Sequence, residues 1–467
     1  MVFSSVSFIY YFLPMFLVLY FMAPRKLKNL VILLASLLFY FYGEPVYSIL
    51  IVLSSGLGYL HGRWIHKKKG GRYEKLPLIS SLATGIGILM FFKYSDFFIK
   101  NINQIFSLNI PFLALKLPIG ISFYTFQILS YTIDVYRGDA KVQRNILKFS
   151  TYVTLFPQLI AGPIVRYTTI ESELSNRKHS FENTAYGINR FIIGLAKKVL
   201  LANTLGQLTK IFLDISEKTM LLYWGYVIAF MLQVYFDFSG YSDMAIGLGR
   251  IMGFHFLENF NYPFISRSIS EFWRRWHISL GTWFRDYVYI PMGGNRVSLL
   301  RWIINVFVVW FLTGFWHGAQ WNYVVWGLYF ALFLVLEKKF IKSILEKLPA
   351  VMGHLYMLFF ITISFAIFAA DDLSGAFNNL KCMFTIKLLP FTNAETTYYL
   401  KSYMFILIFA IAGATPILKG LVGILKSTEI GKKTMNIAEP ILHILLLLLV
   451  TSYLVDGSYN PFLYFRF

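Results

Sequence analysis

Residues 302–336 read WIINVFVVWFLTGFWHGAQWNYVVWGLYFALFLVL, and this run decides the fold class. As one α-helix its 35 residues would be roughly 52 Å long, against a bilayer hydrocarbon core of about 30 Å. We therefore expect two short helices, near 302–315 and 321–337, that meet around residues 314–320. Irregular backbone at membrane depth is stable only inside protein or beside a wet cavity. The run predicts a helical membrane protein with a special junction at its centre.

The composition of the whole chain supports this interpretation. Of its 467 residues, 57% are hydrophobic and only 14% are charged, too few to cover the surface of a soluble domain. Apolar runs of spanning length recur throughout, so we predict an all-α polytopic membrane protein, a single domain over residues 1–467 with roughly ten to thirteen membrane helices. No internal repeat is visible, so an inverted-repeat transporter gains no support.

Basic residues outnumber acidic ones, 43 to 23, which gives a formal charge of +20. They are spread over the loops, which indicates the positive-inside rule and attraction to anionic lipid rather than nucleic-acid binding. The N-terminal apolar run has no preceding basic residue, unlike a signal peptide, and is followed by Arg25, Lys26 and Lys28. With the densely basic loop 66–75, this cluster predicts a cytoplasmic side and an N-terminus outside.

The remaining expected elements follow from the apolar runs. We expect spans at 6–22, 29–43, 46–62, 77–93, 116–136, 148–165, 188–213, 220–236, 351–370, 402–425 and 437–456, a buried or broken segment at 240–256, and an external loop or re-entrant piece within 371–400.

His317 stands at the junction of the opening run, between Gly314 and Gly318. The glycines permit a turn and close approach of a ligand or helix. A buried imidazole needs a polar partner or water, and an ionisable residue within a membrane is a functional candidate. The alternative is a structural histidine at a helix end.

The stretch EFWRRWHISLGTWFRDYVYIPMGGNR, residues 271–296, mixes tryptophans with arginines. That composition suits a membrane interface, and an interfacial segment without chemistry explains most of it, but not His277. If its start is helical, Arg274 and His277 share a face that suits a phosphate-bearing cofactor or a lipid headgroup. PMGGN, residues 291–295, is predicted to form a turn.

Asp237 and Asp243 lie in the otherwise apolar stretch YFDFSGYSDMAIG, residues 235–247. Buried carboxylates need partners, and we expect arginines from 267–301 to pair with them. A proton relay is the alternative role.

Other catalytic patterns are missing from the sequence. Cys382 is the single cysteine, so no intrachain disulfide or cysteine metal cluster is expected, and packing is its expected role. The eight histidines have no zinc-site spacing and no GxSxG motif occurs, so no metal is predicted. What remains is histidine-based general-base chemistry, in which an imidazole takes the proton of a hydroxyl that attacks an acyl thioester.

These motifs resemble the membrane-bound O-acyltransferase family, in particular its bacterial alginate O-acetyltransferase branch. The resemblance rests on FWRRWHISLGTWFRDYVYIPMGGNR followed by GFWHGAQWNYVVWG, and on LPIGISFYTFQILSYTIDVYRG (117–138), FPQLIAGPIVRY (156–167) and YFDFSGYSDMAIG. It covers most of the chain to about residue 340. It implies a ring of tilted helices around a tunnel, with His317 as the catalytic histidine and His277 as the second polar position. Within these motifs Arg274, Trp316, Asn322 and Asp237 become candidates for substrate binding.

The resemblance also implies a function. The chain is expected to move an acyl group, foremost acetyl, from acetyl-CoA or a carrier to an extracytoplasmic polysaccharide such as alginate or cellulose, without a permanently bound cofactor. The chain itself is expected in the cell membrane, that is, the plasma or inner membrane. An esterase-like partner outside this membrane would complete the transfer. D-alanyl transfer to teichoic acid, a proton-coupled transporter or flippase, and a scaffold for another transferase are the alternatives. His317 acts as a base alone or carries the acyl group briefly.

Overall fold

The computed structural model describes residues 2–160, 162–385 and 387–457. Within these ranges all regular structure is helical and no strand occurs, which confirms the all-α prediction. The chain divides into two compact units, one made of Met1–Phe191 with Met244–Leu257 and the other of Ile192–Asp243 with Glu258–Phe467. Whether they form the predicted single domain around a tunnel stays a prediction.

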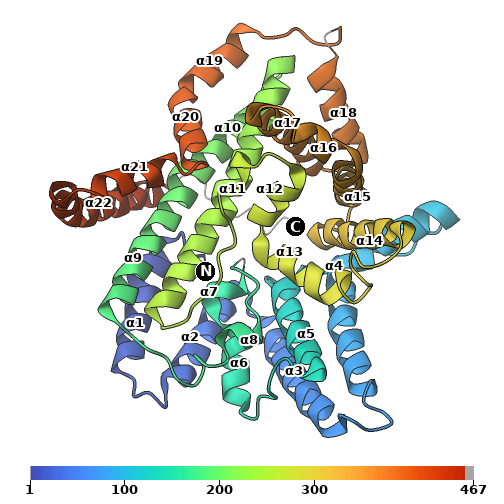
Figure 1. Ribbon diagram of the computed structural model, residues 1–467, viewed down its shortest axis with the longest axis vertical. Coiled ribbons are helices and arrows are strands. Elements are labelled where there is room, and N and C mark those ends of the chain that lie inside the picture. Colours follow the sequence, from blue (N-terminus) through green and yellow to red (C-terminus); the bar gives the residue numbers. More distant parts are fainter. Residues whose placement is uncertain (1, 161, 386, 458–467) are drawn as a thin grey trace. The chain divides into compact units, whose positions relative to one another are not determined.

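The first unit contains the N-terminal helices (Figure 1). They are η1 (Ser7–Phe12), α1 (Leu13–Met22), α2 (Lys28–Gly43), α3 (Ser48–Lys68), α4 (Leu76–Phe106), α5 (Ile121–Arg137), α6 (Ile146–Thr154), α7 (Phe156–Leu159) and α8 (Tyr167–Ile170). Helices α9 (Phe181–Ala196) and α11 (Met220–Ile251) have residues in both units.

The second unit contains the remaining elements. They are η2 (Lys197–Ala202), α10 (Asn203–Asp214), η3 (Pro263–Ile265), α12 (Ile269–Arg275), α13 (Ile278–Phe284), η4 (Arg285–Tyr289), α14 (Leu299–His317), α15 (Trp321–Leu336), η5 (Glu337–Ile341), α16 (Lys342–Leu345), α17 (Ala350–Phe368), α18 (Leu373–Phe384), α19 (Ala394–Ser402), α20 (Met404–Gly413), α21 (Ile417–Lys426) and α22 (Glu429–Val455).

Aromatic rings from α1, α2 and α7 form the core of the first unit. The ring centroid of Phe156 lies 5.2 Å from that of Phe16 and 5.5 Å from that of Phe39, and all three side chains are buried. Helices α3, α4 and α5 lie side by side next to this core (Figure 1). Burial of such large rings is the main favourable contribution to packing here.

A close helix crossing organises the second unit. Helices α14 and α15 form the hairpin expected from residues 302–336, because α14 ends at His317 and α15 begins at Trp321. A Cβ on Gly327 would lie 2.2 Å from the carbonyl oxygen of Trp310, and one on Gly314 would lie 2.3 Å from that of Tyr323. The glycines therefore let two backbones touch, one helical turn before His317.

The expected turn at Gly318 is only partly correct. Gly318 has φ −169°, an extended conformation open to any residue. A Cβ there would lie 2.3 Å from the ring of Tyr323, so close approach, not backbone freedom, requires the glycine. The predicted turn at residues 291–295 is confirmed, since Gly293 and Gly294 have φ of 103° and 57°.

Length and composition identify the membrane helices. Among the described residues six helices are long and apolar enough to cross a membrane, or seven if the bent pair α19 and α20 counts as one span. The other expected spans fall on helices that do not meet this test, such as α3 and the shorter Ser7–Met22 and Lys28–Gly43, or on the broken pair α6 and α7. The protein is a multi-pass membrane protein.

One predicted break is absent. The segments expected at 220–236 and 240–256 are a single helix, α11, in which Gly240 is an interior residue. A Cβ on Gly240 would lie 2.7 Å from the carbonyl oxygen of Gly194. Gly240 therefore serves a close helix contact rather than a break, and the expectation of burial around it is confirmed.

Candidate active site

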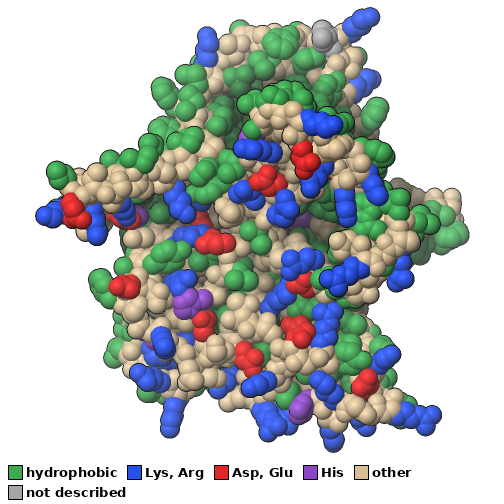
Figure 2. Space-filling model, viewed as in Figure 1, with side chains coloured by type: hydrophobic (Ala, Val, Ile, Leu, Met, Phe, Trp, Pro, Cys, Tyr) green, Lys and Arg blue, Asp and Glu red, His purple; other side chains and the backbone are tan. Residues whose placement is uncertain are grey.

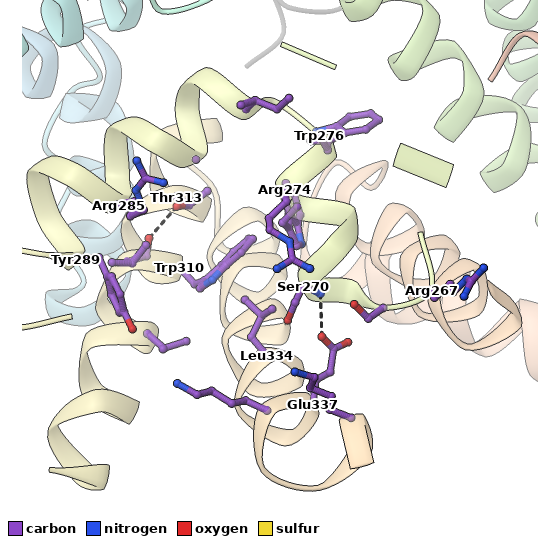
Figure 3. A pocket seen from close by; sticks show the side chains of 18 of the residues that line it. Arg267, Ser270, Arg274, Trp276, Arg285, Tyr289, Trp310, Thr313, Leu334 and Glu337 are labelled. Carbon is purple, nitrogen blue, oxygen red and sulfur yellow. Dashed lines mark hydrogen bonds between the residues drawn. The ribbon is translucent and has the colours of Figure 1, made fainter. Parts of the chain in front are cut away.

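Helix α12 is fixed at its N-terminus by three side chains. The N-cap Ser268 accepts a hydrogen bond from the backbone N–H of Glu271, and the Glu271 carboxylate accepts one from the N–H of Arg267, the residue before the cap. The buried carboxylate of Glu337 accepts from the N–H groups of Ile269 (2.7 Å) and Ser270 (2.9 Å; Figure 3). These contacts satisfy the free donors of the first turn and favour a negative charge there.

His277 occupies the reversal between α12 and α13. Its backbone is left-handed, with φ 45° and ψ 54°, and its side chain is 2% exposed. The imidazole packs edge-on against Phe238, with ring centroids 4.6 Å apart, and its Nδ1 lies 3.1 Å from Oδ1 of Asn259. A non-glycine residue in this region costs on the order of 1 kcal/mol, so the surrounding contacts determine its place.

His317 is the last residue of α14 and lies among aromatic rings. Its ring centroid is 5.1 Å from that of Trp326 and 5.4 Å from that of Phe368, and both rings are nearly perpendicular to it. The ring of Trp316 packs edge-on against it, with centroids 5.0 Å apart, and its centroid lies 6.1 Å from that of His277. The structure thus brings the two predicted histidines together on either side of one tryptophan.

The two imidazoles affect each other electrostatically. His277 belongs to none of the helices long enough to span a membrane. Burial, and then the charge of His317, hold the pKa of His277 well below its ordinary value. His277 is therefore neutral near pH 7 and can accept a proton.

Two cavities lie beside the histidines. The larger has a volume of about 1210 Å³ and includes His277, Arg274 and Thr313 in its lining. The smaller, about 40 Å³, is lined by His317, Asp237 and aromatic rings. Trp273 and Trp276 line both, so these two indoles separate the cavities.

The larger cavity is basic. Its lining contains five cationic residues, Arg267, Arg274, Arg285, Lys338 and Lys342, against two acidic ones, Glu337 and Glu346. Figure 3 shows the Arg274 side chain projecting into its centre, and Figure 2 shows Lys and Arg gathered over α12 and α16. Asp286 pairs with Arg285 at 2.7 Å and raises its pKa. Such a cavity suits a ligand with several phosphates.

The face predicted for Arg274 and His277 is wrong in detail. Helix α12 ends at Arg275, so the two residues do not share a helix face. They nonetheless line the same cavity, because the reversal at His277 brings the chain back beside α12.

The aspartates pair with lysines that were not among the partners predicted for them. Asp237 forms an ion pair of 2.6 Å with Lys198, and Asp243 one of 2.7 Å with Lys197, and both lysines belong to η2. Lys198 and Asp237 are both nearly fully buried. The signal was present in the sequence, as two lysines inside the expected span 188–213.

Trp316 and Asn322 have defined places in the structure. Trp316 is 5% exposed and contacts both imidazoles, whereas Asn322 is fully buried and donates to the carbonyl oxygen of Ala370 at 2.8 Å. Neither lines the two cavities. Their assignment to substrate binding stays a prediction.

Sequence reasoning missed Asn259 and Glu337. Asn259 belongs to an irregular segment without any recognisable motif, and only the fold places it beside His277. Glu337 was visible as a carboxylate at the end of an apolar run, but its role as a cap for α12 depends on tertiary packing.

No group of three or more His, Cys, Asp or Glu side chains that could hold a metal occurs among the described residues. Cys382 is buried, as expected for a packing residue, and its sulfur lies 3.8 Å from Oδ1 of Asn378.

Comparison with known proteins gives concordant matches. The model of the membrane-bound O-acyltransferase family matches residues 137–374. The chain is 40% identical to the probable alginate O-acetylase AlgI of Pseudomonas aeruginosa over 395 residues, 82% of this chain and 75% of that protein. It is 35% identical to AlgI of Azotobacter vinelandii over the full length of both. It is 33% identical to the peptidoglycan O-acetyltransferase of Helicobacter pylori, over 82% of this chain and 80% of that protein.

Proposed function

Since the chain belongs to the membrane-bound O-acyltransferase family and is an acyltransferase, we propose that it transfers acetyl groups from a cytoplasmic thioester, foremost acetyl-CoA, toward the hydroxyl groups of an extracytoplasmic polysaccharide. The relatives are named for acetylation of alginate and of peptidoglycan, so their acceptors are glycans. An alginate-like or cellulose-like polymer is the proposed acceptor here.

The observation that carries this proposal is the pair of cavities that share Trp273 and Trp276. The basic cavity of about 1210 Å³ suits the phosphates of a nucleotide thioester, with Arg274 as a phosphate contact. His277 lines the same cavity. The thioester carbon would then lie at the tryptophan pair, next to both imidazoles.

The size of the small cavity favours acetyl over a larger acyl group. A water-sized sphere needs about 10–15 Å³ by this measure, so the cavity of about 40 Å³ holds roughly three such spheres. An acetyl group has three heavy atoms. A D-alanyl group is larger and carries an ammonium, for which a wall of Phe330, Phe365 and Phe368 offers poor solvation.

The proposed chemistry uses His317 as general base. Its imidazole takes the proton of an acceptor hydroxyl as the oxygen attacks the thioester carbon, and the C–O bond forms as the carbonyl opens to a tetrahedral oxyanion. Collapse breaks the C–S bond, and the thiolate leaves with the proton from the imidazolium. His277, neutral and held 6.1 Å from Trp316, would donate or accept a proton in the same step.

The cellular setting is part of the proposal. The loop charges support an N-terminus outside the plasma or inner membrane, with the donor on the cytoplasmic side. A separate esterase-like protein outside the membrane would pass the group to the polymer.

The test replaces His317 by alanine and measures acetyl ester in the surface polymer together with release of the thiol from labelled acetyl-CoA. We expect both to fall at least a thousandfold with normal amounts of protein in the membrane. His443→Ala is the matched control, since His443 is a buried histidine of α22 remote from the cavities in sequence and lining neither. Full activity of His317→Ala would refute the proposal, as would movement of an unmodified substrate in place of ester formation.

A further inference from the structure

One carbonyl oxygen organises the surroundings of His277. Oδ1 of Asn259 lies within hydrogen-bond distance of three groups: Nδ1 of His277 at 3.1 Å, the backbone N of Ser279 at 3.1 Å and Oγ of Ser279 at 2.9 Å. The Asn259 side chain is fully buried. Its Nδ2 has no hydrogen-bond partner among the described residues, so the contacts of Oδ1 account for its polar role.

The segment around Asn259 also binds the backbone on both sides of His277. The N–H of Asn261 donates to the carbonyl oxygen of Arg275, and that of Ile278 donates to the carbonyl oxygen of Asn259. These bonds, at 2.9 and 3.0 Å, bracket the residue whose φ is 45°. The strained backbone of His277 is thus held by this segment rather than by its own helix.

The hydrogen bonds determine which nitrogen of His277 carries the proton. The backbone N–H of Ser279 can only donate, so the Asn259 atom that it contacts is the carbonyl oxygen. An oxygen acceptor requires Nδ1 of the neutral His277 imidazole to be protonated. Nε2 is then the basic nitrogen.

We propose that Asn259 is a positioning residue that holds His277 in the tautomer whose Nε2 can accept a proton during acyl transfer. This inference rests on the proposed function. It adds a residue that touches no reacting atom but determines which atom of His277 reacts.

The charged groups around His277 permit a clean test. His317 of α14 is the titratable group whose charge acts on it, Asp237 of α11 is paired with Lys198, and Arg275 of α12 with Glu271. Arg274 is exposed toward the larger cavity. A new charge at position 259 therefore acts on His277 directly.

The experiment compares Asn259→Asp with wild type across pH, in membranes supplied with labelled acetyl-CoA. A carboxylate keeps the three accepted hydrogen bonds and stabilises the imidazolium, so the acidic limb of kcat/KM should move to higher pH by about 1 unit or more. Asn259→Ala should lower kcat by about 10–100-fold with KM nearly unchanged. Ser279→Ala is the matched control, because it removes one donor to the same oxygen and leaves Nδ1 of His277 bonded; it should stay within about threefold of wild type.

The outcomes separate this inference from the proposed function. The positioning role would be overturned if the acidic limb of kcat/KM did not move in Asn259→Asp, or if Ser279→Ala lost as much kcat as Asn259→Ala. In both cases an inactive His277→Ala would leave the proposed function standing. Full activity of His277→Ala would instead remove His277 from the mechanism.

Discussion

The close crossing of α14 and α15 offers a sharp test of how the site is built. In Gly327→Ala the new Cβ would lie 2.2 Å from the carbonyl oxygen of Trp310 and 3.1 Å from Cα of Gly314. Ordinary contact needs about 3.5 Å, so α14 and α15 must separate by about 1 Å. His317 follows Gly314 by one helical turn and moves with it.

The expected cost has two parts. Overpacking of this kind destabilises a protein by about 1–3 kcal/mol. A misplacement of about 1 Å at a catalytic group lowers its contribution by about 100-fold, so kcat/KM for acetyl transfer should fall by roughly that factor. The catalytic loss should exceed what the loss of folded protein explains.

The assay measures transfer of labelled acetyl by membranes containing equal amounts of protein, with thermal unfolding in detergent as the measure of stability. Gly87→Ala is the matched control, because Gly87 is also a helix-interior glycine, in α4, and a Cβ there meets nothing within 4 Å. It should be neutral or stabilise by up to about 1 kcal/mol. A folded Gly327→Ala protein with half of the wild-type activity or more would refute the idea that this crossing positions His317.

Three further predictions concern single side chains. Arg274→Ala should raise KM for acetyl-CoA about tenfold and Arg301→Ala, exposed on α14 outside the cavity, should not; an unchanged KM would remove Arg274 from the donor site. Asp237→Ala should lower the free energy of unfolding by about 3–5 kcal/mol, because Lys198 is left charged and buried, and adding Lys198→Met should restore much of it; thermal unfolding in detergent tests both. Because the pKa of His277 is lowered in the folded state, the unfolded state binds more protons below about pH 6.5, and stability should fall there by up to about 1.4 kcal/mol per pH unit. Denaturation curves of His277→Gln should lack that part of the acid sensitivity.

The hairpin of α14 and α15 was predictable because its signal is one of length and composition. An apolar run too long for one crossing must bend, and glycines beside a histidine indicate where. The two segments meet within a few residues of the expected positions, and His317 lies at the junction as predicted. Close approach of Gly314 to Gly327 needs the pairing of two helices and cannot be read from either alone.

Partners in space were harder to predict than elements in sequence. Asp237 needed a buried cation, but sequence distance favoured the nearby arginines, whereas the fold supplies Lys198 from η2. In the same way, the sequence pointed to His277, because an interfacial segment did not explain it. Nothing in the sequence pointed to Asn259 as its partner. Tertiary pairing, rather than local pattern, decides both cases.

The two histidines reach the site by different routes, and this difference has a consequence for its chemistry. His317 is carried by the end of a helix whose place depends on a backbone contact at Gly314 and Gly327. His277 itself has a strained, left-handed backbone, and its Nδ1 hydrogen bond to Oδ1 of Asn259 holds it in place. Neither imidazole is positioned by the helix end next to it alone, so both depend on packing between elements. Helix α12, which precedes His277, also contacts α15 and α17. The most damaging substitutions should therefore include residues that take no part in the chemistry, namely a glycine at the α14–α15 crossing and Asn259 beside the His277 imidazole. Each of them holds a reacting nitrogen within the small distance that acyl transfer tolerates.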